Sequence, residues 1–142
     1  MTTYTFLEIP NTSGKIIDSI TLTSSDYLSF PTFFAEKHKL KEIDEKLYLH
    51  LFYDKRKMAV AIQFSTKKSG DTYPVNGPEQ YGATCKIKSF LLRNDINAEL
   101  YKGRYEYKKV AASELGLEGE ALFIIELTKN AESLTDTEEK EM

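Results

Sequence analysis

Tyrosines alternate with basic residues in the segment YKGRYEYKK, residues 101–109. If this segment is a strand, Tyr105 and Tyr107 point to the same face, because side chains alternate along a strand. Aromatic rings beside lysines and arginines could stack on nucleic-acid bases while the cations neutralise phosphates. The same pattern also fits a plain strand, since tyrosine favours strands and lysine at a sheet edge deters aggregation. Both interpretations stay open at this point.

Basic residues are concentrated in the segment 84–109, which has seven of them against three acidic residues. Three more lie in a predicted hairpin, two of them in its turn and one at the start of its second strand. Clustered cations of this kind are candidates for phosphate contacts, although a solvated surface of mixed charge has a similar composition. The candidate basic residues are Lys86, Lys88, Arg93, Lys102, Arg104, Lys108 and Lys109, with Lys55, Arg56 and Lys57 from the hairpin.

The segment 131–142 is strongly acidic. It has five acidic residues and one lysine, a net charge of −4, so residues 1–130 have a net charge of +1 within the total of −3. Such a segment buries too little apolar surface to offset the entropy of ordering, about 1 to 2 kcal/mol per residue. We therefore predict a disordered acidic tail, which could occupy the basic segment in the absence of a ligand or recruit a partner.

The sequence has no catalytic or metal-binding signature. His38 and His50 are the only histidines, and neither has a cysteine or histidine at metal-ligand spacing. We expect His38 on the surface of a helix, His50 in a strand, and Cys85, the single cysteine, buried as a small apolar residue. The segment GLEGE, residues 116–120, lacks the lysine and the spacing of a phosphate-binding loop. We therefore expect no enzymatic activity, no cofactor and no bound metal.

Composition is that of a globular protein. The chain has 142 residues, of which 41% are hydrophobic and 29% charged, enough for one domain or two small halves that share a core. No apolar run approaches the roughly 20 residues of a membrane-spanning helix, and the first residues lack the basic and apolar regions of a secretory signal. A single cysteine also fits a reducing compartment. We expect a cytoplasmic location and no membrane partner.

Residues 1–64 are predicted to form a first half. Strands are expected at 3–9 and 15–23, followed by a helix that begins with Pro31 at its first position and runs to about Leu40. Phe30 and Phe34 are expected to be buried. The apolar runs 46–53 and 57–64 flank the turn Asp-Lys-Arg and predict a hairpin.

The second half is predicted at residues 82–130, after a linker at 65–81 that is rich in Gly, Pro, Ser, Asp and Asn. A helix is expected to begin near Lys88 or Ser89, with Phe90 and Leu91 facing inward, and strands are expected in GRYEYKKV and ALFIIEL. The order of elements thus recurs with a spacing near 60 residues. We predict an α+β fold of two pseudo-repeated halves, each a short helix on a compact, antiparallel, barrel-like sheet. The alternative is a single open sheet with helices on one face.

The segment 26–64, DYLSFPTFFAEKHKLKEIDEKLYLHLFYDKRKMAVAIQF, resembles the swapped-hairpin units of AbrB-type and MraZ-type DNA-binding regulators. Those units have a strand that enters a helix through a proline, then a Leu-Gly-Leu-x-x-Gly-Asp stretch and two strands. Pro31 corresponds to the helix-opening proline, Leu40 to the end of the helix and Asp44 to the carboxylate of the Gly-Asp pair. The hairpin follows in register.

The segment also departs from the family pattern. Asp26 and Tyr27 replace the turn glycine and an arginine, His38 and Lys39 replace Leu and Gly, and Ile43 replaces Gly. Asp tolerates the left-handed turn conformation. The lost arginine removes a residue that such proteins can use on DNA.

The resemblance implies a non-enzymatic DNA-binding protein that regulates transcription, with a homodimer left open. A second hypothesis is single-stranded nucleic-acid binding, with Tyr101, Tyr105 and Tyr107 as stacking residues and the acidic tail covering the basic groove. A third is a protein-interaction or structural module that binds another chain through a sheet edge or an apolar groove.

Overall fold

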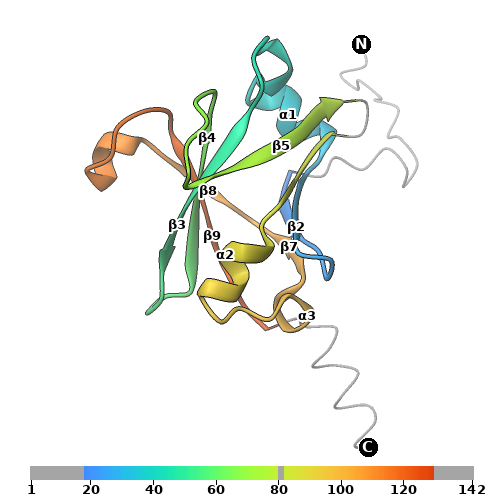
Figure 1. Cartoon of the computed structure of the whole chain (residues 1–142), viewed down its shortest axis with the longest axis vertical. Coiled ribbons are helices and arrows are strands. Elements are labelled where there is room, and N and C mark those ends of the chain that lie inside the picture. Colours follow the sequence, from blue (N-terminus) through green and yellow to red (C-terminus); the bar gives the residue numbers. More distant parts are fainter. Residues whose placement is uncertain (1–17, 80–81, 130–142) are drawn as a thin grey trace, which may run out of the picture.

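Nine antiparallel strands form one curled sheet, with three short α-helices packed around it (Figure 1). The computed structural model describes residues 18–79 and 82–129, so the predicted strand at 3–9 and the acidic tail lie outside the described residues. The strands are β1 (Ile20–Leu22), β2 (Tyr27–Phe30), β3 (Tyr48–Asp54), β4 (Ala59–Ser65), β5 (Thr72–Glu79), β6 (Gly82–Lys86), β7 (Gly103–Tyr105), β8 (Lys108–Val110) and β9 (Leu122–Glu126). The helices are α1 (Thr32–Lys37), α2 (Lys88–Arg93) and α3 (Ala98–Tyr101), with 3-10 turns η2 (Leu40–Glu42) and η3 (Ala112–Leu115).

The sheet curls into a half-barrel. Its strand order is β7-β1-β2-β6-β5-β3-β4-β9-β8, which makes β7 and β8 the two outer strands. Only Glu106 and Tyr107 separate these two strands along the chain, so the backbone itself brings the two edges of the sheet together. The prediction of one continuous strand at 103–110 is therefore wrong: the segment leaves one edge and enters the other.

The β3–β4 hairpin was predicted correctly. Its strands pair in register from Tyr48 opposite Ser65 to Asp54 opposite Ala59. An Asp54 carboxylate oxygen accepts the backbone N–H groups of Arg56 at 3.0 Å and Lys57 at 3.3 Å, which holds the turn in place. Turn residues of this type are favoured because the Asp side chain can satisfy nearby backbone donors.

Helix α1 begins after a proline, as predicted, but it is shorter than expected. Pro31 precedes the helix as its cap rather than occupying its first position, and its missing N–H leaves no donor unsatisfied. The helix ends at Lys37, because Lys39 adopts a left-handed conformation with φ of 59° and the chain continues into η2. The α-helical hydrogen-bond ladder does not continue through a residue with this backbone geometry.

The core is centred on an aromatic cluster beneath α1. Phe30 and Phe34 are both fully buried, which confirms the prediction for these two residues. The Phe34 ring centroid lies 5.2 Å from that of Phe30, 4.9 Å from that of Phe123 and 5.1 Å from that of Tyr107. Phe64 completes the cluster. The rings meet edge-on or tilted, the arrangements that aromatic quadrupoles favour.

The segment expected to be a linker contains β5, which pairs with β3 on one side and β6 on the other. Strands from the two predicted halves are also neighbours elsewhere, since β1 pairs with β7 and β4 with β9. One sheet thus runs through the whole described chain. The prediction of an antiparallel, barrel-like sheet with short helices is confirmed, as one nine-stranded half-barrel.

Helix α2 begins at Lys88, with Phe90 and Leu91 buried as predicted, and β9 lies within the predicted strand ALFIIEL. Gly82, at the start of β6, allows the backbone of β6 to approach that of β2 closely. It has a φ of 97°, and a Cβ there would lie 2.2 Å from the Phe30 carbonyl oxygen. Only glycine adopts this geometry at so close an approach without strain.

No helix among the described residues is long and apolar enough to span a membrane.

Candidate functional site

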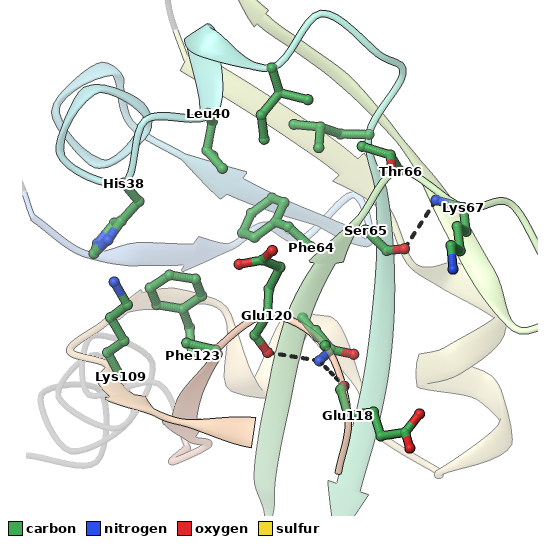
Figure 2. A pocket seen from close by; sticks show the side chains of 15 residues that line it. His38, Leu40, Phe64, Ser65, Thr66, Lys67, Lys109, Glu118, Glu120 and Phe123 are labelled. Carbon is green, nitrogen blue, oxygen red and sulfur yellow. Dashed lines mark hydrogen bonds between the residues drawn. The ribbon is translucent and has the colours of Figure 1, made fainter. Parts of the chain in front are cut away.

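A hollow of about 610 Å³ opens at the end of the half-barrel next to α1 (Figure 2). We call it the mouth hollow. Its floor is apolar and consists of Leu40, Leu47, Phe64 and Phe123, each at least 94% buried. Its rim has polar and charged groups from separate elements: His38, Lys67, Lys109, Glu118 and Glu120. An apolar floor with a few converging polar groups is the usual construction of a small-molecule site.

Gln63 holds the loop on one side of this rim. Its buried side-chain amide donates to the backbone oxygens of Glu118 and Glu120, both at 2.8 Å (Figure 2). Gly119 lies between these two acceptors with a φ of 96°. A Cβ at Gly119 would lie 3.0 Å from the Gln63 nitrogen, so the loop wraps tightly around the amide.

A polar chain holds the opposite side of the rim. Tyr107 Oη donates to Asp18 Oδ1 at 2.5 Å and therefore accepts from His38 Nε2, which lies 2.8 Å away. Asp18 also forms an ion pair of 2.7 Å with Lys37. This arrangement assigns the Nε2–H tautomer to His38 because the tyrosine has one proton to donate.

We predicted that His38 lies on the surface of the helix, and the structure shows that this prediction is wrong. It is half-buried at the end of α1, and its ring centroid lies 4.5 Å from that of Phe34 and 4.6 Å from that of Phe123. Burial lowers the pKa of His38, and the nearby cations Lys109 and Lys37 lower it further. The neutral imidazole is thus the favoured form in the folded protein.

We expect the protein to lose stability as the pH falls below about 6.5, the ordinary histidine pKa, in part because of His38. The pKa of His38 is lower in the folded state than in the unfolded state, so between these two values the unfolded state binds more protons. The contribution of His38 is complete above the unfolded-state pKa and is lost as the pH falls through the folded-state pKa. Thermal melts between pH 7.5 and 5.0 should therefore show a smaller decrease in Tm for His38→Gln than for the wild type.

His50→Gln is the matched control, because His50 lies on β3 and takes no part in the polar chain. Burial disfavours the ionised form of Asp18, but hydrogen bonds from Lys37 and Tyr107 outweigh it and lower its pKa from 3.8. The protonation of Asp18 therefore changes the stability mainly below pH 5.0, outside the range of these melts. Equal slopes of Tm against pH in wild type and His38→Gln would contradict the role of His38.

Nine of the ten predicted basic contacts are exposed and form no ion pair within the part of the chain that the structure describes. The tenth, Lys102, is half-buried and pairs with Glu99 at 2.8 Å. Lys55, Arg56 and Lys57 occupy the β3–β4 turn, which we call the basic turn. Helix α2 lies at the same end of the molecule (Figure 1), and the Tyr53 and Phe90 ring centroids are 6.0 Å apart. Lys88 and Arg93 are on the exposed side of this helix.

Two further basic residues share the outer face of the sheet. Arg104 on β7 lies opposite Thr21, and the row continues through Ser29 on β2 and Thr84 on β6. Lys86, two residues beyond Thr84, faces the same way because side chains alternate. The structure therefore brings Arg104 and Lys86 to one polar face.

Lys108 and Lys109 are adjacent on β8 and face opposite sides of the sheet. The Lys109 Nζ atom lies 5.9 Å from the Phe123 ring centroid, at the mouth hollow. Lys108 lines a second hollow of about 400 Å³ together with Lys57 and Phe52. This second hollow is where the two basic regions of the sequence meet.

The three tyrosines of the stacking alternative are packed into the fold rather than arranged on one face of a strand. Tyr105 is 8% exposed, and its hydroxyl donates to the backbone oxygens of Tyr101 and Thr128. Tyr107 is half-buried and its hydroxyl belongs to the polar chain with His38. Since β7 ends at Tyr105, the two rings do not lie on the same face of a strand. Tyr101 is also packed against the core.

No family model, curated protein or solved structure matches this chain. Within the described ranges, no group of three or more His, Cys, Asp or Glu side chains is placed to hold a metal ion. The site must therefore be interpreted from its own geometry.

Sequence reasoning found the exposed cations but missed the mouth hollow and Gln63. The one available signal for Gln63 was an amide within the otherwise apolar run AVAIQF. A buried amide needs hydrogen-bond partners, which indicates a second segment folded over the strand.

Proposed function

We propose that this protein is a non-enzymatic DNA-binding protein of regulatory type that contacts duplex DNA through the basic turn. The observation that carries the proposal is the row Lys55, Arg56, Lys57 at the tip of a two-stranded ribbon, exposed and without ion pairs among the described residues. The hydrogen bonds from Asp54 order the backbone that presents them. Cations at fixed positions replace counterions on DNA at a lower entropy cost than mobile ones.

The shape of the hairpin suits a groove of DNA. The major groove is about 12 Å wide and accepts a two-stranded β-ribbon as well as a helix. The β3–β4 ribbon extends toward its basic tip at one end of the molecule, beside α2 (Figure 1). Arg93 and Lys88 on α2 would then contact the flanking phosphates.

The outer face with Arg104 and Lys86 is a second candidate contact. Hydroxyl groups of Thr21, Ser29 and Thr84 lie between these two cations in the pairing register. Arg, Lys, Ser and Thr side chains are common donors to phosphate oxygens. This face supports binding to the backbone rather than sequence recognition.

The order of elements supports the proposed likeness to AbrB-type regulators. A strand, Pro31, a short helix and the hairpin follow one another in β2, α1, η2, β3 and β4. We also propose that the two halves are related by an approximate twofold axis between β2 and β6. The order β1-β2-α1-β3 recurs as β5-β6-α2-β7, and the pairs β1–β7 and β5–β3 correspond to each other. A cytoplasmic location and a homodimer belong to the same proposal and rest on the sequence alone.

Binding to a duplex of about 20 base pairs across salt concentrations tests this function. Each phosphate contact contributes about 0.9 to the slope of log affinity against log salt concentration. The variant Lys55→Gln/Arg56→Gln/Lys57→Gln should lower this slope by up to about 2.7 and weaken binding at least about tenfold at low salt. Fluorescence anisotropy of a labelled duplex measures both quantities.

The matched control is Lys39→Gln/Lys67→Gln/Lys68→Gln, which removes the same charge from exposed positions away from the basic turn. It should leave the slope nearly unchanged. Equal losses in the two variants would mean that only total charge matters, and the hairpin assignment would then be wrong. Preference for single strands would favour the stacking hypothesis, although the burial of Tyr105 argues against it. Absence of any nucleic-acid binding would favour a protein-interaction module.

A further inference from the structure

We propose that the mouth hollow binds a small organic monocarboxylate, whose apolar body lies against the floor of the hollow and whose carboxylate pairs with Lys109. This site is separate from the proposed DNA contact. Gln63 and Lys67 of the hollow lie at the end of β4 and just beyond it, whereas the basic turn precedes the start of the same strand. The inference therefore holds whether or not the protein binds DNA.

The size and lining of the hollow define the body of the ligand. A volume of about 610 Å³ lies within the range of roughly 300 to 1,000 Å³ typical of small-molecule sites. Leu47, Phe64 and Phe123 form an apolar floor at one side. Ile43, at the rim, is 37% exposed and is one of few large apolar side chains so exposed among the described residues. Covering Ile43 would remove apolar surface from water, which favours an aromatic or branched apolar ligand.

The charge of the rim defines the polar group of the ligand. Lys109 is exposed and forms no ion pair among the described residues, and its ammonium lies over the Phe123 ring at 5.9 Å. Among the described residues, Lys67 is the only other Lys or Arg that lines the hollow, and Glu118 and Glu120 oppose these two charges. Because two lysines face two carboxylates, the rim suits a ligand with a single negative charge, which would lie beside Lys109. The two carboxylates would repel a phosphate dianion more strongly than a monocarboxylate, because the repulsion grows with the charge of the ligand.

Hydrogen bonds within the protein fix the two sides of the rim. Gln63 holds the Glu118–Glu120 loop through two hydrogen bonds of 2.8 Å, and Tyr107 holds the His38 ring, which interacts electrostatically with Lys109. Figure 2 shows the His38 ring and the end of the Lys109 side chain on the same side of the Phe123 ring. Binding would therefore cost little conformational entropy in the protein.

His38 provides a direct readout of where the carboxylate binds. The charged groups around this imidazole are Lys37 on its own helix, Lys109 on β8 and Asp18 before β1, with the Tyr107 hydroxyl as its hydrogen-bond partner. A carboxylate beside Lys109 would offset one of the two cations that disfavour the imidazolium. The pKa of His38 should then rise on binding, while the chemical shifts of His50 give an internal reference because these are the only histidines.

The experiment is a titration of the full-length protein with 3-phenylpropionate, followed by NMR of the histidine and phenylalanine rings and the backbone. We expect saturable shifts at His38 and Phe123 with a Kd of about millimolar, given a small ligand of this size. The neutral analogue 3-phenylpropionamide should bind at least tenfold more weakly, and inorganic phosphate should cause no saturable shift. Lys109→Gln should weaken carboxylate binding at least tenfold, whereas Lys108→Gln, on the other face of β8, should not.

Three results would overturn the proposal. Equal binding of the carboxylate and the amide would show that Lys109 recognises no charge. Unchanged affinity in Lys109→Gln would place the carboxylate elsewhere. Shifts at Phe52 and Ile124 instead of His38 and Phe123 would assign the ligand to the second hollow. Lys109 is exposed, so its replacement leaves the core intact and the comparison is made between folded proteins.

Discussion

Replacement of Phe34 by alanine is expected to lower the free energy of unfolding by about 3 to 5 kcal/mol, the usual cost of removing a fully buried phenylalanine ring. Phe34 has no solvent exposure and its ring contacts those of Phe30, Phe64 and Phe123. These rings belong to β2, β4 and β9, so they are held by the pairing of the sheet and can close only part of the resulting cavity. Incomplete relaxation is what makes such a truncation costly.

Urea unfolding monitored by circular dichroism measures this loss. Phe33→Ala is the matched control, because Phe33 is the preceding residue of the same helix but is only half-buried. Its loss should be about 1 kcal/mol, since a partly exposed ring leaves less cavity behind. Similar losses for the two variants would mean that α1 does not anchor the core through Phe34.

The local parts of this fold could be predicted from the sequence. The strand before Pro31, the hairpin around Asp54 and the helix at Lys88 all follow from residues a few positions apart. Proline removes a donor and fixes its own φ, and aspartate caps the following turn, so these signals act without knowledge of the rest of the chain. The burial of Phe34 also followed from helical spacing.

The parts of the fold that depend on long-range pairing could not be predicted. Strand β5 has the composition of a loop, with Pro74 and Gly77 inside it, and it is a strand because β3 and β6 pair with it. The split between β7 and β8 is likewise invisible locally. Tyr105 ends β7 facing the core, whereas Lys108 begins β8 at the other edge of the sheet. Tertiary context overrides strand propensity in both cases.

The basic turn and the mouth hollow also differ in whether their residues are close together in the sequence. The basic turn is contiguous in sequence, and its exposure follows from the hairpin that it connects. The mouth hollow combines His38, Gln63, Lys109 and Glu120, which are distant in sequence and come together only when β8 and β9 join the sheet beside α1. Of these, only the buried amide gave a sequence signal, because it required partners that its own strand does not supply.

Cys85 is expected to react with a thiol reagent such as DTNB at pH 8 at least about 1000-fold more slowly in the native protein than in the unfolded chain. Cys85 is fully buried, and burial raises the pKa of its thiol from 9.0 to about 12, although Lys46 opposes this rise. The thiolate is the reactive form, and a rise of the pKa from 9.0 to about 12 reduces its population about 1000-fold at pH 8, which sets a lower limit on the slowing because burial also keeps the reagent away. Release of the coloured thiolate from DTNB, with and without 6 M guanidinium chloride, gives the two rates.

The slow reaction of Cys85 in the native protein should also depend on the stability that the buried Phe34 ring provides. Since a fully buried thiol reacts only after the surrounding structure opens, the observed rate follows the population of the open form when closing is faster than reaction. Phe34→Ala should therefore accelerate the reaction by a factor of about 100 or more if global unfolding exposes Cys85, because each 1.4 kcal/mol changes that population about tenfold. An acceleration far below this value, with the stability loss confirmed, would show that Cys85 is exposed by local opening of β6 rather than by loss of the whole core. Fast reaction of the wild type at the rate of the unfolded chain would contradict the burial itself.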